Sequence, residues 1–337
     1  AIRAEFMRRS HARFTLTGGE DEATDYCGMQ IRRDWVAQTV TLHQSKFAHK
    51  LMEKYDLVGK RIEPMPFKAG PHALVPWDGN PTDRDVFDYC GCVGDLMWLS
   101  RTHPDIAWRV ADLAQHMQSP GPLHVAAALH VLRYLSGHLN EGLTYHGSND
   151  VLMHPYDHRN KLILATDSTF SHAGVKATGG AAVFMNGAAI AWKIRRQTTV
   201  SLVSAEAEVK SCTMGVEMIL ALRDLHGELV RAEHGAIRVL VDNKAAIAQM
   251  SRGVDGTVCA AYKRAQQYCE DAFARGIVWY DYVPGILNPA DPLTKQVRNI
   301  GEFQDKNGIL CGSRPSVYAG DLVDEALASP SAGGAKR

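Results

Sequence analysis

Several features are missing from this sequence, and each absence removes a class of protein. No apolar run is long enough to cross a membrane and no secretory signal is present, so we expect an intracellular protein with reduced thiols and no membrane partner. The seven cysteines lack the paired spacing of a zinc site, and the fifteen histidines show no HExxH pattern. No glycine-rich segment follows the phosphate-loop pattern, so we expect no small-molecule cofactor.

The charge balance and the length limit the possible partners and the number of domains. Lysine plus arginine equals aspartate plus glutamate, at 37 each, so no overall basic field indicates a nucleic-acid partner. The hydrophobic fraction of 45% and the charged fraction of 22% are typical of a globular protein. A chain of 337 residues exceeds one ordinary core, which favours two domains. The first residue is Ala1 rather than methionine, so we expect a piece of a longer polypeptide.

Four acidic residues between Leu162 and Lys295 occupy positions typical of a metal site. They are Asp167, Glu208, Asp242 and Asp291. Asp167 and Asp242 each end an apolar run, which places them at the carboxyl ends of strands, while Glu208 lies near the start of a long helix and Asp291 opens a helix after a proline-containing loop. Converging carboxylates make a hard-oxygen site for Mg²⁺ or Mn²⁺. Two such ions, about 4 Å apart, are the usual means of cleaving phosphodiesters.

Each acid also has a purely structural interpretation. Asp167 could form a turn after its strand, and Asp242-Asn243 could be the N-cap of the following helix, although a capping residue could also be a ligand. Asp291 could simply compensate the dipole of the helix that it opens.

Helical geometry selects one of two neighbouring glutamates. At 100° per residue, Glu206 shares its side of the helix with a polar row that we expect to be solvated, and the helix dipole accounts for it. Glu208 shares its side with Cys212 and Ile219, which places it close to the sheet. We therefore predict Glu208 as the metal ligand.

The order of elements in the second half predicts a mixed sheet. Apolar runs separated by glycine-containing turns predict three antiparallel strands at 161–166, 179–185 and 188–194. Helices at 204–230, 245–250 and 259–275 alternate with strands that end at Asp242 and Val283. In the first half we predict a hairpin between Asp25 and Val40 and helices at 45–55, 83–100, 104–117 and 123–137, with an added helix at 5–14 and a strand at 143–145.

A set of motifs in collinear order resembles the Pol polyprotein of Copia-type LTR retrotransposons. In the first half these are Leu42-His-Gln-Ser-Lys-Phe47, Val93-Gly-Asp-Leu-Met-Trp98, Thr102-His-Pro-Asp-Ile-Ala107 and Leu132-Arg-Tyr-Leu-Ser-Gly137. In the second half they are Gln197-Thr-Thr-Val200, Ser204-Ala-Glu-Ala-Glu208, Val241-Asp-Asn243 and Ala290-Asp-Pro-Leu-Thr-Lys295. The polymerase signature Tyr-x-Asp-Asp is absent. The resemblance therefore implies the thumb and connection end of a reverse transcriptase followed by its RNase H domain.

With that resemblance, the predicted fold class is α/β: an RNase H-like mixed five-stranded sheet flanked by helices, preceded by a mostly helical domain with a small hairpin. We predict the end of the palm and the start of the thumb at 1–60, a helical thumb or connection region at 61–150, the RNase H-like domain at 158–300 and a disordered tail at 312–337. The implied activity is hydrolysis of the RNA strand of RNA/DNA hybrids with two Mg²⁺ or Mn²⁺ ions. The implied partners are the hybrid and the upstream palm and fingers of the same polyprotein.

Five further residues are candidates for substrate binding. Lys193, Arg195 and Arg196 cluster at a strand end and could position phosphates, or they could form a solvated basic edge. Asn243 follows the third acid, and Lys263 lies on the later helix.

Some residues depart from the family pattern. Cys259 to Lys263 replace the usual Thr-Lys-His run, and Ser168-Thr-Phe170 replaces Ala-Asp-Trp. These departures keep open a catalytically inactive, nucleic-acid-binding remnant. An integrase-like polynucleotidyl transferase would use a similar acidic set, but it usually brings a His/Cys zinc module that this sequence lacks.

Overall fold

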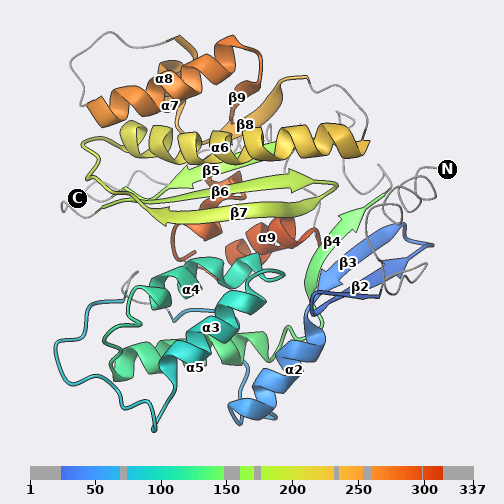
Figure 1. The fold of residues 1–337 in the computed structure, drawn as a ribbon, viewed down its shortest axis with the longest axis vertical. Coiled ribbons are helices and arrows are strands. Elements are labelled where there is room, and N and C mark those ends of the chain that lie inside the picture. The colour runs from blue at the N-terminus through green and yellow to red at the C-terminus, as the bar shows by residue number, and fades with distance from the viewer. Residues whose placement is uncertain are drawn as a thin grey trace, which may run out of the picture.

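Two β-sheets and the helices that cover them make up the part of the chain described by a computed structural model. The description covers residues 24–68, 74–147, 160–170, 176–230, 235–252, 260–297 and 299–313 (Figure 1). The helix predicted at 5–14 lies outside the described residues, and so does the tail predicted at 312–337 except for residues 312 and 313. Within the described residues, no helix is long and apolar enough to cross a membrane.

The larger sheet has five strands in the order β7-β6-β5-β8-β9. Their bounds are β5 Ile163–Ser168, β6 Thr178–Met185, β7 Ala188–Arg196, β8 Ile237–Val241 and β9 Val278–Tyr282. The three consecutive strands β5, β6 and β7 pair antiparallel, whereas β8 runs parallel to β5 and β9 parallel to β8. This confirms the mixed, RNase H-like sheet that the sequence predicts.

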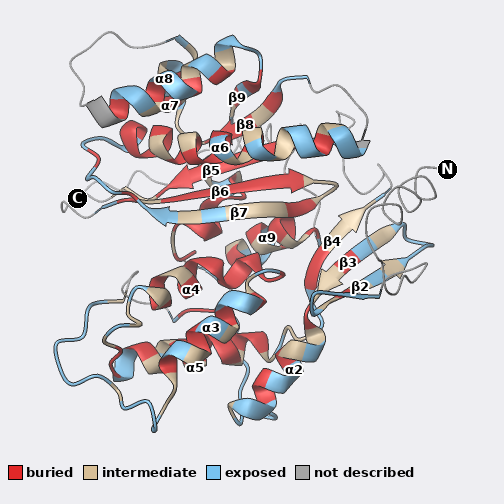
Figure 2. Cartoon of the chain, viewed as in Figure 1, coloured by how far each residue is buried: buried red, intermediate tan, exposed pale blue. Residues whose placement is uncertain are grey.

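Helices cover both faces of this sheet. The long helix α6 (Ser204–Val230) packs on one face, with α7 (Lys244–Arg252) and α8 (Ala260–Ala274) beside it, and α9 (Ile300–Cys311) lies on the other face (Figure 1). Successive strand residues point to opposite faces, so Leu164 contributes to the α6 core and Ala165 to the core beneath the sheet. The central strands β5 and β6 are buried, whereas the outer strand β7 is partly exposed (Figure 2).

The first half forms a helical region with its own core. It contains α2 (Ser45–Lys54), α3 (Tyr89–Leu99), the 3-10 turn η1 (Pro104–Ile106), α4 (Ala107–Ala114) and α5 (Pro122–Leu135). Their apolar faces meet in one cluster of buried side chains, which also takes in two residues from the far end of the chain, Val297 and Phe303.

The predicted hairpin belongs to a four-stranded antiparallel sheet, ordered β1-β2-β3-β4. Its strands are β1 (Asp25–Tyr26), β2 (Met29–Asp34), β3 (Thr39–His43) and β4 (Gly142–His146). The last strand pairs with β3 from about 100 residues away in the sequence. Gly142 permits this approach, because a Cβ at that position would lie 2.1 Å from the Leu42 carbonyl oxygen.

Several predicted boundaries were wrong. The helix predicted from Asp83 begins at Tyr89, because the Asp88 side chain caps it by accepting from the Gly91 amide. Asp291 opens only a 3-10 turn, η3 (Asp291–Leu293). The last helix is α9, which we did not predict from the sequence. The division into domains stays a prediction.

Candidate active site

Three of the four predicted acids meet at one edge of the larger sheet. Asp167 is near the carboxyl end of β5, Asp242 follows β8 directly, and these strands are parallel neighbours, so their ends lie side by side. Glu208 reaches the same edge from the second turn of α6. One carboxylate oxygen from each residue lies within 4.8 Å of the other two. Asp167 and Glu208 are buried, and Asp242 is half-buried.

Glu208 is held by only one of its two oxygens. Its Oε1 accepts from the Ser168 backbone amide at 3.1 Å and from the Ser168 hydroxyl at 2.6 Å. Its Oε2 is buried and has no hydrogen-bond partner within the described structure. A buried carboxylate oxygen without a donor is costly, which indicates a place for a cation.

The other glutamate has a different role from the one predicted. We expected Glu206 in a solvated row, but its side chain is 5% exposed. It lies 2.7 Å from the Lys210 ammonium, and its second oxygen accepts from the Leu202 amide. The segment before α6 folds over the first turn of the helix and covers this side chain. The structure therefore places Glu208, and not Glu206, beside Asp167.

Asp291 stands next to the three acids but is paired with lysines. Its Oδ1 contacts the Lys295 ammonium, and its Oδ2 lies 2.6 Å from the Lys306 ammonium. Lys295 also lies 3.8 Å from Oδ2 of Asp167, so it links Asp291 to the other acids. Thr294 donates to the same Asp167 oxygen.

Burial and mutual repulsion shift the acids toward their protonated forms. Burial raises the pKa of Asp167 to about 7, and the carboxylates of Asp291 and Asp242 add to the rise while Lys295 opposes it. Burial, followed by repulsion from Asp167 and Asp242, raises the pKa of Glu208 to about 9. The pKa of Asp242 is raised by burial as well. Carboxylates with raised pKa values, converging within 4.8 Å, are the arrangement that a divalent cation would relieve.

The donor set fits a hard cation. All three converging groups are carboxylates, and the free Oε2 of Glu208 is an unused anionic oxygen. Mg²⁺ and Mn²⁺ prefer ligands of this kind. Asp167, Glu208 and Asp242 would hold such an ion, with Asp291 at the side.

Helix α7 is capped by Asn243 and not by Asp242. The Asn243 side-chain oxygen accepts from the amides of Ala245 and Ala246, both at 3.0 Å. The pair Asp242-Asn243 therefore does cap the helix, through Asn243, and the Asp242 carboxylate remains for the acidic site. Lys263, another predicted substrate contact, is exposed on α8.

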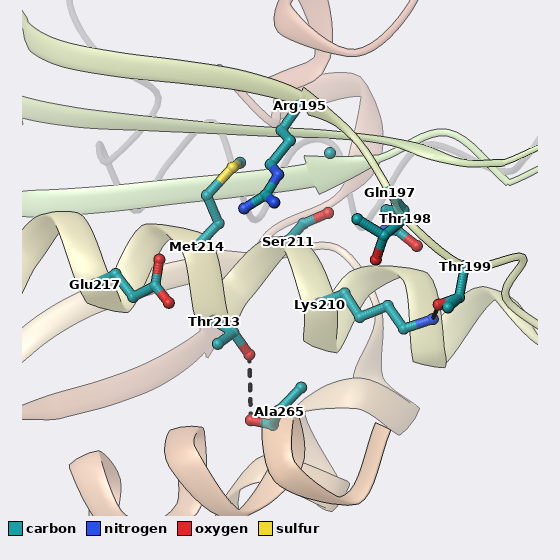
Figure 3. Close-up of a pocket in the computed structure, with 11 residues that line it drawn as sticks. Arg195, Gln197, Thr198, Thr199, Lys210, Ser211, Thr213, Met214, Glu217 and Ala265 are labelled. Atoms are coloured by element: carbon teal, nitrogen blue, oxygen red, sulfur yellow. Dashed lines mark hydrogen bonds between the residues drawn. The ribbon is translucent and has the colours of Figure 1, made fainter. Parts of the chain in front are cut away.

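The predicted basic residues of β7 lie in different surroundings. Lys193 is exposed, and Arg196 donates to Gln115 Oε1 at 3.1 Å. Arg195 lines a surface cavity of about 220 Å³ between β7, α6 and α8, together with Lys210 and Ser211 (Figure 3). In Figure 3 the Arg195 guanidinium points toward the cavity.

Sequence reasoning missed four residues that contact the acids, namely Ser168, Thr294, Lys295 and Lys306. Ser168 and Thr294 are polar neighbours of Glu208 and Asp167, and both stand inside quoted motifs that could have pointed to them. Lys306 carried no such signal, because it lies in a helix that the sequence patterns did not reveal.

A search of solved structures returns RNase H domains. One is the N-terminal RNase H domain of Rv2228c from Mycobacterium tuberculosis, with 18% sequence identity, a TM-score of 0.32, and coverage of 40% of this chain and 90% of that chain. Because this TM-score is low, the fold assignment does not rest on this likeness. It comes from the strand order and the strand directions.

The curated relatives include transposon polyproteins. No protein-family model matches the chain. It is 28% identical over 211 residues to the retrovirus-related Pol polyprotein from transposon TNT 1-94 of Nicotiana tabacum, covering 60% of this chain and 15% of the relative. It is 29% identical over 203 residues to the corresponding protein from transposon RE1 of Arabidopsis thaliana, covering 59% of this chain and 13% of the relative. The chain therefore spans only a small part of these relatives. The chain is therefore similar to retrovirus-related Pol polyproteins of plant transposons, in agreement with the Copia-type resemblance of its collinear motifs.

Proposed function

We propose that this chain is an RNase H-type endonuclease that hydrolyses the RNA strand of RNA/DNA hybrids, as part of a retrotransposon reverse transcriptase polyprotein. The observation that carries the proposal is the meeting of Asp167, Glu208 and Asp242 within 4.8 Å at the edge where β5 and β8 end. The similarity to retrovirus-related Pol polyproteins supports the polyprotein context.

Asp167, Glu208, Asp242 and Asp291 would hold two Mg²⁺ or Mn²⁺ ions. When bound, two such ions activate a water for attack on phosphorus and stabilise the leaving oxygen. The chain's own groups prepare the site: Ser168 fixes one oxygen of Glu208 and leaves the other free. Because Asn243 accepts the hydrogen bonds from the first-turn amides of α7, the Asp242 carboxylate is not needed as the helix cap.

The substrate would be recognised through its backbone and sugars. Contacts to 2′-hydroxyls across the shallow minor groove distinguish an RNA strand from DNA. The exposed Lys193 and the Arg195 cavity offer cationic positions for phosphates beside α6. Cleavage would leave a 5′ phosphate and a 3′ hydroxyl. The upstream palm and fingers of the polyprotein would deliver the hybrid.

The test uses the full chain with labelled RNA/DNA hybrid in Mg²⁺. We expect cleavage of the RNA strand, no cleavage of duplex DNA, and loss of activity in EDTA. Asp167→Asn is the matched inactive control, because it removes a buried charge with little change of shape. Equal cleavage of hybrid and duplex DNA, or cleavage that persists in EDTA, would refute the proposal.

A further inference from the structure

Helix α9 joins the helical region to the acidic site. It lies between the larger sheet and the helices of the first half (Figure 1), where it contacts β7, β4 and the 3-10 turn η1. The Asn299 side chain caps its first turn by accepting from the Glu302 amide at 2.7 Å. Gly312 ends it with φ of +75°, a conformation that favours glycine. Both ends of the helix are therefore well defined.

Side chains of α9 belong to two different cores. Phe303 is 1% exposed, and its ring lies 5.6 Å from that of Phe67 and 5.9 Å from that of Tyr134, both in the helical region. Ile309 and Leu310 instead pack in the core beneath the larger sheet. The position of α9 is consequently set by the first half of the chain as well as by the sheet.

Lys306 follows Phe303 by one helical turn and ends at the acidic site. Its side chain is 3% exposed, and its ammonium lies 2.6 Å from Asp291 Oδ2 and 2.7 Å from Glu302 Oε1. It also donates to the Gly285 carbonyl oxygen at 3.4 Å. All three ammonium hydrogens thus have an acceptor. An added Cβ at Gly285 would come within 3.0 Å of Asp242 Oδ2, so this loop also touches the acidic cluster.

The two lysines of Asp291 differ in how firmly they are held. Lys295, which contacts Oδ1, is 40% exposed and also lies 3.8 Å from Asp167, so a cation bound among the acids could take its place. Lys306, which contacts Oδ2, is buried, and its departure would leave Oδ2 of Asp291 and Oε1 of Glu302 without their cation. Only Oδ1 of Asp291 can therefore become available to a cation.

We propose that Lys306 is a positioning residue of the nuclease site. It fixes Oδ2 of Asp291 so that Oδ1 alone faces the other acids, and through α9 it makes the helical region of the first half a structural part of that site. This inference rests on the proposed function. It also implies that a fragment ending at residue 300 lacks a component of the site.

The experiment is a double-mutant cycle in the full chain, with Lys306→Met, Asp291→Ala and the double variant. Two quantities are measured: the stability of the metal-free chain by urea unfolding, and Mn²⁺ binding by electron paramagnetic resonance. We expect Lys306→Met to weaken Mn²⁺ binding and hybrid turnover by about 10- to 100-fold, the range seen for groups that orient metal ligands. The KM for the hybrid should stay within about twofold, since Lys306 does not face substrate.

Two further variants separate positioning from general damage. In the Asp291→Ala background, Lys306→Met should add no further loss of Mn²⁺ binding, because it acts only through Asp291. Lys306→Arg keeps the charge and should retain most of the binding. Arg109→Met is the matched control: it breaks another buried pair, 2.7 Å from Asp112, but touches none of the four acids. It should lower stability without weakening Mn²⁺ binding.

The outcomes distinguish this inference from the proposed function. Additive losses in the double variant, or an equal loss of Mn²⁺ binding in Arg109→Met, would overturn the role of Lys306. Absence of coupling between positions 291 and 306 in metal-free unfolding would overturn it whether or not the chain cleaves hybrid. Coupling together with Mn²⁺ binding but no cleavage would instead refute the nuclease and leave the positioning of Asp291 in place.

Discussion

Replacing Glu208 with glutamine should have opposite effects on activity and on stability. The amide oxygen can still accept the two bonds from Ser168, so the packing at the start of α6 is kept. The second oxygen, however, becomes a neutral amide nitrogen at the place where Glu208 offers its free Oε2. We expect cleavage of the hybrid to fall by orders of magnitude, because an amide is a poor substitute for an anionic ligand of a hard cation.

The effect on stability follows from the raised pKa of Glu208. In the unfolded chain this carboxyl ionises above pH 4.5, whereas in the folded, metal-free chain it keeps its proton until about pH 9. Folding therefore takes up a proton between these values, and the folded state loses stability as pH rises through the window. At 1.36 kcal/mol per pH unit, the penalty is about 3 kcal/mol at pH 7 and about 1 kcal/mol at pH 5.5. Glu208→Gln does not titrate and escapes the penalty.

The assay is urea unfolding of both proteins in EDTA at several pH values between 5 and 8, with hybrid cleavage measured in parallel. The free energy of unfolding of Glu208→Gln should exceed that of the parent chain by an amount that grows with pH. Glu206→Gln is the matched control on the same helix, and it should instead lose about 1–3 kcal/mol, because Lys210 is left without its buried carboxylate partner. Its cleavage activity should be kept. A Glu208→Gln protein that is less stable than the parent at pH 7, or that still cleaves, would refute the reasoning.

Three other predictions concern the whole chain. Phe303→Ala should lower the free energy of unfolding by about 3–5 kcal/mol in urea titrations, because it empties a ring-sized space between Phe67 and Tyr134. A loss below about 1 kcal/mol would show that α9 is not anchored there. Adding Mg²⁺ at 100 times its dissociation constant should stabilise the parent chain by about 2.7 kcal/mol, visible as a rise in Tm, and this gain should largely disappear in Asp167→Asn; an equal gain in both proteins would place the ion elsewhere. The chain should not extend a primer on a template in a nucleotide-incorporation assay, because the sequence contains no Tyr-x-Asp-Asp signature; template-directed addition would show that the polymerase residues were misidentified.

The sequence alone determined the elements whose patterns are local. Apolar runs that end in Asp167 and Asp242 marked two strands, and the alternation of strands and helices predicted a mixed sheet. The helical period likewise placed Glu208 on the sheet side of α6, which the structure agrees with. These inferences needed only the side chains within a few residues of each position.

Only the tertiary structure decided which elements and charged residues pair when they lie far apart in the sequence. We expected Glu206 in solvent, but its side chain binds Lys210 and the Leu202 amide of the loop before α6. The helical period gives only the side of the helix on which Glu206 lies, and it carries no information about the loop. Strand β4 pairs with β3 across about 100 residues, and Lys306 reaches Asp291 from a helix of weak amphipathic pattern. The physical reason is the same in each case. A local sequence pattern shows which face of an element is apolar, whereas the partner of a buried charge depends on which elements meet in space. Only the folded chain brings α9, η3 and β5 together.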